Sequence, residues 1–333
     1  MIGSSSRNTV PELDFAVCQT TRVVPGTSQC VSIRPPTPRL ISTFLVFCLF
    51  ITVLSGCGGV AGIGNGVSSA STPTSQLAHV FLLVEENHSY SSVIGNSSMP
   101  YLNGLASKYG VATQYFADTH PSIGNYFMLT TGQIITNDDS FGGTVNADNI
   151  VHHLIAAGKT WRSYAESLPA NGYMADGPYP YAKNHNPFPY FSDVVNSSTQ
   201  TANLVPFSQF PTDLSSGQLP DFSLIVPNLQ NDAHDGTLGQ ADAWLQQNIA
   251  PLISNPVFQN SLLIIVFDES DLTDWDNGGG HVAALIISPK AKSGYKSTTT
   301  YQHQSTLRLI LRALGISSFP GAAAGAADMS EFF

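Results

Sequence analysis

From residue 78 onward, short apolar segments rich in β-branched residues alternate with segments of helical character. Buried strands that alternate with helices are typical of a parallel sheet covered on both faces. The sequence therefore predicts one α/β domain over residues 78–333, with a doubly wound, mainly parallel sheet. The predicted strands are Ala78–Val84, Phe222–Val226, Ser261–Phe267 and Val282–Ile287. The predicted helices are residues 101–109, Ser122–Thr131, Asn149–Ala157, Leu238–Leu252 and Thr306–Leu314, and residues 166–219 are predicted to be rich in loops.

Residues 1–57 are predicted to be an N-terminal extension and a lipoprotein signal peptide. Arg34 and Arg39 precede an apolar run over residues 40–54, and small residues follow that run. This order is typical of a secretory signal, and the run is short for a membrane span. Leu54-Ser55-Gly56-Cys57 resembles the lipobox of bacterial lipoproteins, in which the cysteine carries the lipid. We expect export and lipid anchoring to a membrane through Cys57, in the periplasm or at the cell surface, with an uncleaved membrane helix as the alternative.

The chain that follows the predicted anchor is acidic and contains no cysteine. Beyond residue 57, nine basic and 21 acidic residues give a net charge of −12. We therefore expect no general nucleic-acid binding, which needs a basic surface. Residues 58–77 are rich in Gly, Ser, Thr and Ala and are predicted to be a flexible tether. Because the four cysteines are Cys18, Cys30, Cys48 and Cys57, a thiol nucleophile and cysteine-ligated zinc are excluded from the domain.

Polar side chains follow three of the predicted strands. Glu86-Asn87 and Asp268-Glu269 come directly after apolar strands, and residues 228–235 follow a third. Open α/β sheets place their sites outside the carboxyl ends of strands, so these segments are expected to converge. Carboxylate and amide oxygens suit Mg²⁺, Mn²⁺ or Ca²⁺. The alternative is that the acidic residues are solvated loop residues or helix caps.

Ser122 lies at the start of a predicted helix, within Asp118-Thr119-His120-Pro121-Ser122-Ile123-Gly124-Asn125. A serine there often serves only as an N-cap. As a metal-bound hydroxyl it is instead a nucleophile for phosphorus, with the helix N-terminus facing the phosphoryl group. Asn125, one turn later, is placed to donate its amide N–H to a phosphoryl oxygen. Histidines in polar surroundings add further candidates, among them His185, His234 and His303.

Six motifs in order resemble the bacterial acid phosphatase/phospholipase C phosphoesterase family of the alkaline phosphatase-like superfamily. They are Glu86-Asn87-His88-Ser89-Tyr90, His120–Tyr126, Trp161–Glu166, His185–Phe188, Asn231–Asp235 and Phe267–Ser270. The resemblance covers roughly residues 78–333. The chain departs from the family at Gly124, where many relatives have proline, and we expect the glycine to loosen the turn.

The resemblance implies an alkaline phosphatase-like fold with Ser122 as the nucleophile. It implies divalent-metal ligation by Glu86, Asn87, Asp268 and Glu269, with Ser122 also on the metal. His185 and His234 would contact the phosphate. Asp232 and His303 occupy positions similar to those of second-metal ligands elsewhere in the superfamily.

The predicted function is a metal-dependent phosphoester hydrolase, an acid phosphatase that acts on small phosphomonoesters through a phosphoserine. Protonated histidines would make such a reaction faster in acid. Two alternatives stay open. The first is a phosphodiesterase or phospholipase C with the same site, although the domain is shorter than the large phospholipase C members. The second is a non-catalytic surface lipoprotein that binds a glycan or another partner.

Overall fold

The computed structural model describes residues 76–333. The predicted signal peptide, Cys57 and nearly all of the predicted tether lie outside the described residues. Within residues 76–333, no helix is both long enough and apolar enough to cross a membrane.

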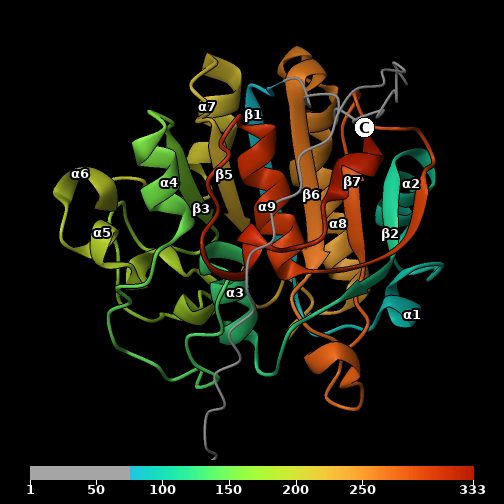
Figure 1. Ribbon diagram of the computed structural model, residues 1–333, viewed down its shortest axis with the longest axis horizontal. Coiled ribbons are helices and arrows are strands. Elements are labelled where there is room, and N and C mark those ends of the chain that lie inside the picture. Colours follow the sequence, from blue (N-terminus) through green and yellow to red (C-terminus); the bar gives the residue numbers. More distant parts are fainter. Residues whose placement is uncertain (1–75) are drawn as a thin grey trace, which may run out of the picture. The chain divides into compact units, whose positions relative to one another are not determined.

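An eight-stranded sheet forms the centre of the domain, in the order β4-β3-β5-β1-β6-β7-β2-β8 (Figure 1). All neighbouring pairs run parallel except those of β7, which is antiparallel to both β6 and β2. The prediction of a mainly parallel sheet is confirmed. The strands are β1 (His79–Glu85), β2 (Gly110–Phe116), β3 (Trp161–Ala165), β4 (Leu204–Pro206), β5 (Phe222–Val226), β6 (Ser261–Phe267), β7 (Ala284–Ile287) and β8 (Lys296–Gln302).

Helices cover both faces of this sheet. Helices α3, α4 and α9 pack together on one face, and α2 packs with α8 on the other. Figure 1 shows α9 and α3 in front of the strands and α8 behind them. The helices are α1 (Tyr90–Val93), α2 (Pro100–Lys108), α3 (Ser122–Thr131), α4 (Ile150–Ala156), α5 (Ser192–Val195), α6 (Ser198–Thr201), α7 (Gln209–Ser216), α8 (Leu238–Ser254) and α9 (His303–Ala313). Short 3₁₀ helices are η1 (Lys183–His185), η2 (Phe188–Tyr190), η3 (Pro256–Asn260), η4 (Asp276–Gly278), η5 (Gly321–Ala324) and η6 (Met329–Phe332).

The central strands are buried because both of their faces carry apolar side chains. Every residue of β5 and β6 is buried, as is every residue of β1 after His79. The pairing of β1 with β6 runs in register from His79↔Ser261 to Glu85↔Phe267. The two strands therefore end at the same level, and the residues that follow them emerge side by side.

Several element bounds agree with the prediction and several elements were missed. The bounds of β5, β6 and α3 match it, and the other predicted strands and helices are present with shifted ends. Strands β2, β3 and β8 were not predicted, and residues 166–219 hold β4 and α5 to α7 among their loops. Strand β8 reads KSTTTYQ and lies at the sheet edge with most of its side chains exposed, so it lacks the apolar run by which buried strands are recognised.

Candidate active site

Three acidic side chains meet where adjacent parallel strands end. Glu86 follows β1, Asp268 follows β6, and Asp232 lies in the loop after β5. The Asp268 N–H donates to the Glu85 carbonyl at 2.9 Å, and the Glu86 N–H donates to the Asp232 carbonyl at 2.8 Å. These backbone bonds fix the three segments to one another. Each of the three carboxyl groups is buried almost completely.

Ser122 is held against this cluster as the first residue of α3. Its Oγ donates to Glu86 Oε2 at 3.0 Å. Tyr126, four residues later on the same helical face, donates its hydroxyl to Glu86 Oε1. The Ser122 side chain is buried, and its hydroxyl points at a carboxylate, which is an acceptor for its proton. No role was predicted for Tyr126 from the sequence, although its position four residues after Ser122 places both side chains on one face of a predicted helix.

His185 completes a group with metal-binding geometry. Its Nδ1 lies 3.4 Å from Glu86 Oε1 and 3.3 Å from Asp232 Oδ2. One donor atom each from Glu86, His185 and Asp232 lies within 4.8 Å of the others. Asp268 Oδ2 is buried beside them without a hydrogen-bond partner among the described residues. Buried oxygen donors, an imidazole and an unpartnered carboxylate oxygen are a donor set that fits a divalent cation.

The electrostatics of the cluster favour either bound cations or protonated carboxyl groups. Burial raises the pKa of Glu86 well above its usual value, and the charges of Asp268 and Asp232 raise it further. Burial likewise raises the pKa of Asp268. The pKa of Glu269 rises to about 9, through burial first and then through the charges of Asp268 and Asp139. Ionised, these side chains would repel one another in a medium that screens charge poorly.

Asn125 and Glu269 lie in a second group next to the first. Asn125 Oδ1 accepts the backbone N–H groups of Asp118 and Thr119 at 3.0 and 3.2 Å. Its Nδ2 donates to the Thr119 carbonyl at 2.8 Å and to Glu269 Oε2 at 3.4 Å. His120 Nδ1 also lies 3.1 Å from Glu269 Oε2. Asn125, which was expected to contact a phosphoryl oxygen, here stabilises the turn before Ser122. His120 also lies next to the site, although no role was predicted for it from the sequence.

Asn87 takes part in the site through its backbone. Its φ of 56° lies in the left-handed region, which Asn tolerates better than most residues. In that conformation its N–H donates to Asp268 Oδ1 at 3.1 Å. Its side chain makes no hydrogen bond with the described residues and is free to serve as a ligand, as the resemblance implies.

The structure separates the roles of His234 and His303. The ring of His234 lies 5.6 Å from that of His185, at the exposed edge of the site, and its Nδ1 pairs with Asp235 at 2.8 Å. His303 is fully buried behind Asp268, with its ring nitrogens 2.6 Å from the Asp268 carbonyl and 3.1 Å from the Tyr115 hydroxyl. Burial lowers the pKa of His303 to about 4, so its ring is neutral at pH 7. Both nitrogens are engaged, and a direct contact of His303 with phosphate or metal does not fit this geometry.

A loop over residues 133–143 packs on the turn that carries Ser122. Asp139 accepts the Ile123 N–H at 3.1 Å, and Asn137 Nδ2 donates to Thr119 Oγ1 at 2.8 Å. A Cβ at Gly124 would lie 2.4 Å from Asn137 Oδ1 and 2.5 Å from Thr119 Cγ2, so a larger residue would require both side chains to shift. The expectation that Gly124 loosens the turn stays a prediction. No sequence pattern pointed to Asp139.

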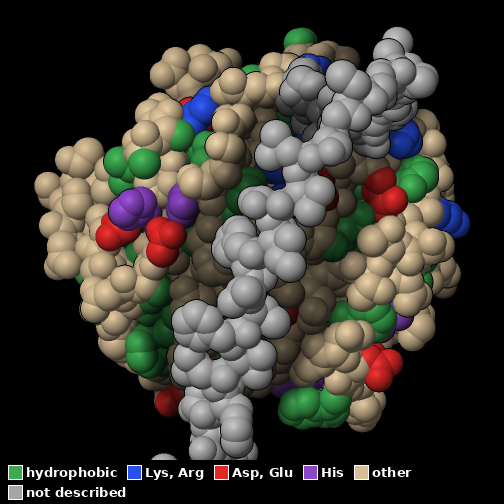
Figure 2. Space-filling view, in the orientation of Figure 1, with side chains coloured by type: hydrophobic (Ala, Val, Ile, Leu, Met, Phe, Trp, Pro, Cys, Tyr) green, Lys and Arg blue, Asp and Glu red, His purple; other side chains and the backbone are tan. Residues whose placement is uncertain are grey.

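A further histidine pair lies outside this site, on α4. The His152 ring is mostly exposed, and His153 pairs with Asp148 at 2.9 Å. Figure 2 shows histidine side chains beside acidic ones on that part of the surface.

Comparisons with known proteins identify relatives of this chain. Residues 95–317 match the Phosphoesterase family, a range that starts just after Glu86 and Asn87. The chain is 38% identical over 214 residues to a phosphatidylinositol-3-phosphatase from Mycobacterium tuberculosis, covering 62% of this chain and 67% of that protein. It is 32% identical over 241 residues to a probable acid phosphatase from Kluyveromyces lactis, covering 68% of this chain but only 56% of that protein.

Two solved structures share the fold at low sequence identity. A protein of the alkaline phosphatase superfamily from Vibrio parahaemolyticus aligns with a TM-score of 0.54 and 13% identity, covering 77% of this chain and 72% of that one. A lipoteichoic acid synthase from Listeria monocytogenes aligns with a TM-score of 0.54 and 10% identity, covering 78% of this chain and 76% of that one. The sheet described above is thus an alkaline phosphatase-like fold, as expected. Since the family match spans most of the chain, the chain belongs to the phosphoesterase family.

Proposed function

We propose that this protein hydrolyses phosphomonoesters as an acid phosphatase, with Ser122 as the nucleophile. The observation that carries the proposal is the hydrogen bond from Ser122 Oγ to Glu86, inside the cluster of three buried acidic side chains. Relatives named as acid phosphatases and as a phosphatidylinositol-3-phosphatase support the reaction class. A buried serine aimed at a carboxylate has the geometry of an activated nucleophile.

The proposed reaction proceeds in two displacements. Ser122 Oγ passes its proton toward Glu86 Oε2 and attacks phosphorus, so that an Oγ–P bond forms while the bond to the leaving oxygen breaks. The leaving oxygen takes a proton at the exposed edge of the site, where His234 lies. A water molecule then attacks phosphorus, the Oγ–P bond breaks, inorganic phosphate carrying the oxygen of that water leaves, and Ser122 Oγ takes back its proton from Glu86. Tyr126 holds Glu86 in position throughout, and Asn125 holds the turn before Ser122.

We further propose that catalysis requires a divalent cation. Glu86, His185 and Asp232 would hold it, and the unpartnered Oδ2 of Asp268 and the side chains of Asn87 and Glu269 are further candidates. When bound, such a cation neutralises the buried carboxylates and lowers the pKa of a nearby hydroxyl. The oxygen-rich donor set suits Mg²⁺, Mn²⁺ or Ca²⁺, and the imidazole of His185 is most compatible with Mn²⁺ among these.

The test is an assay of the full chain with p-nitrophenyl phosphate and with bis(p-nitrophenyl) phosphate. Metal is removed with chelator and restored one ion at a time, at about pH 5 and about pH 8, on either side of the usual imidazole pKa of about 6.5. We expect metal-dependent release from the monoester that is faster in acid. Release from the diester alone would assign a phosphodiesterase. A folded protein that cleaves neither substrate and binds a glycan would contradict the catalytic proposal.

Export and lipid anchoring at Cys57 are proposed on the sequence pattern alone. A cell that expresses the full chain should incorporate labelled fatty acid into it, and Cys57→Ala should abolish the label. Labelling that persists in Cys57→Ala would contradict the anchor.

A further inference from the structure

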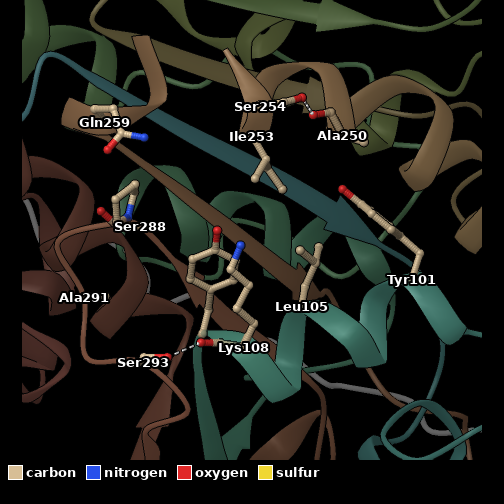
Figure 3. Close-up of a pocket in the computed structure, with 12 residues that line it drawn as sticks. Tyr101, Leu105, Lys108, Ala250, Ile253, Ser254, Gln259, Ser288, Ala291 and Ser293 are labelled. Atoms are coloured by element: carbon tan, nitrogen blue, oxygen red, sulfur yellow. Dashed lines mark hydrogen bonds between the residues drawn. The ribbon is translucent and has the colours of Figure 1, made fainter. Parts of the chain in front are cut away.

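A groove of about 600 Å³ lies at the end of the sheet opposite to the candidate active site. It is bounded by one side of α2 along its length, by the C-terminal end of α8 and by the turn after β7, close to where β6 begins. Figure 3 shows Tyr101, Leu105 and Lys108 of α2 facing Ile253 of α8 across it. Its walls are therefore mainly apolar, with an ammonium group and a phenol at the rim.

The segments that line this groove have an unusual charge for this protein. Residues 100–109, 246–260 and 288–296 contain no Asp or Glu, whereas the described chain has 21 acidic and nine basic residues. Four of those nine, Lys108, Lys290, Lys292 and Lys296, lie in these segments, and all four are exposed. We call these four residues the groove lysines. An acidic domain thus has a basic region around one apolar groove.

Backbone contacts bring the groove lysines together. The Gly294 N–H donates to the Lys108 carbonyl at 3.0 Å, which joins α2 to the segment of the other three lysines. Lys290 and Lys292 flank Ala291, which lines the groove. Lys296 pairs with Val111, three residues after Lys108. These contacts bring the segments that carry the groove lysines together at one end of the sheet, beside the groove.

The charge of the groove lysines is not neutralised within the described residues, where none of the four forms an ion pair. Lys108 Nζ lies over the Tyr109 ring at 4.9 Å. Lys290 donates to the neutral side chain of Asn260, and Lys292 donates to the backbone carbonyl of Glu331 at 2.5 Å. The carboxylate of Glu331 accepts the hydroxyl groups of Ser297, Tyr295 and Tyr301 instead.

We propose that the groove and the groove lysines form a docking surface for a bilayer that contains anionic phospholipid. Lysines near such a surface are attracted to its headgroups, and the apolar walls offer a place for the glycerol and upper acyl carbons of one lipid. The proposed lipid anchor at Cys57 favours a membrane on this side of the domain, because Ala78, just before β1, donates its N–H to the Asn260 carbonyl at 2.9 Å, beside the groove. A nucleic acid would use the lysines but would have no use for an apolar groove between them.

The inference is tested with vesicle sedimentation of the full chain. Vesicles contain either phosphatidylcholine alone or equal parts of phosphatidylcholine and phosphatidylglycerol. The readout is the ratio of the two partition coefficients, because any affinity common to both vesicle types cancels in it. The charge variant replaces all four groove lysines by Gln. The control variant is Lys159→Gln, because Lys159 precedes β3, which lies across β1 from the groove. Ile253→Asn, with Ala250→Gln as a milder second variant, removes apolar groove surface without changing charge.

We expect the wild type to prefer anionic vesicles. Each groove lysine that is replaced should reduce this preference about fivefold. Ile253→Asn or Ala250→Gln should weaken binding to anionic vesicles several-fold, while Lys159→Gln should match the wild type. Turnover of p-nitrophenyl phosphate should be equal in all of these variants, which confirms folding independently of the proposed docking. The inference is overturned if the charge variant keeps the wild-type ratio. It is also overturned if the groove variants bind vesicles like the wild type while a DNA duplex competes with the vesicles.

Discussion

The raised pKa of Glu269 predicts that the metal-free protein loses stability as pH rises. This carboxyl group has a pKa of about 9 in the folded protein and an ordinary value near 4.5 when the chain is unfolded. Between these values the folded state holds a proton that the unfolded state has released. The contribution of Glu269 to stability is therefore fully present below about pH 4.5 and is lost as pH rises toward about 9.

The size of the effect follows from the width of that window. Each pH unit within it costs about 1.4 kcal/mol of the free energy of unfolding per group, so the change from about pH 5 to about pH 8 is at most about 4 kcal/mol for Glu269. The raised pKa values of Glu86 and Asp268 act in the same direction. A bound divalent cation reverses this by stabilising the ionised carboxylates.

The assay is urea unfolding of the chelator-treated full chain at several pH values, followed by tryptophan fluorescence. Glu269→Gln should flatten the decline between about pH 5 and about pH 8. Asp271→Asn is the matched control from the same loop, because hydrogen bonds from Ser89 and Thr273 lower the Asp271 pKa to about 2 and it stays ionised over this range. A metal-free protein that is equally stable at both ends of the range, or a decline unchanged by Glu269→Gln, would refute the reasoning.

Three further predictions concern helix α3. Ser122→Ala should lower phosphatase turnover by at least about 10³-fold with normal folding, as measured by p-nitrophenyl phosphate kinetics and circular dichroism, and near wild-type turnover would exclude Ser122 as the nucleophile. Tyr126→Phe removes a hydrogen bond to buried Glu86 and should lower the free energy of unfolding by about 1.5–3 kcal/mol at neutral pH, measured by urea unfolding. Gly124→Ala should destabilise by about 1–3 kcal/mol and expose residues 133–143 to limited proteolysis, whereas Gly104→Ala, where a Cβ meets nothing within 4 Å, should not; equal cleavage in both would contradict the packing argument.

The parts of the fold that the sequence predicted are those whose pattern is local and apolar. Strand β6, SLLIIVF, is buried at every position, and its bounds could be predicted from composition alone. Strand β2 escaped prediction because its sequence, GVATQYF, mixes polar and small residues, and its place in the sheet depends on pairing with β7 and β8. Pairing across such sequence distances leaves no signal in a short window.

The candidate site was likewise predictable only where a local sequence pattern marks it. That Glu86, Asp232 and Asp268 converge follows from the rule that polar residues at parallel strand ends meet, and the sequence was sufficient for it. The role of each side chain was not predictable in the same way. His303 is neutral because it is buried against the Asp268 carbonyl, and Asp139 reaches Ile123 from a loop that no motif marks. Such roles depend on which hydrogen-bond partner lies nearest in space.

The reversed direction of β7 has a consequence for how the site can change. Because β6 and β7 are antiparallel neighbours, residues 268–283 leave the sheet and return to it at the site edge, with both ends fixed by the pairing of Val266 with Ala284. Asp268 and Glu269 start this loop, while its tip carries Leu272 and Trp275, which are 69% and 61% exposed. The tip is not independent of the site, because the Trp275 ring lies 4.5 Å from that of His120, and His120 Nδ1 lies 3.1 Å from Glu269 Oε2. A change at Trp275 is therefore transmitted through His120 to Glu269, whereas Leu272 offers an exposed position for altering the rim of the site.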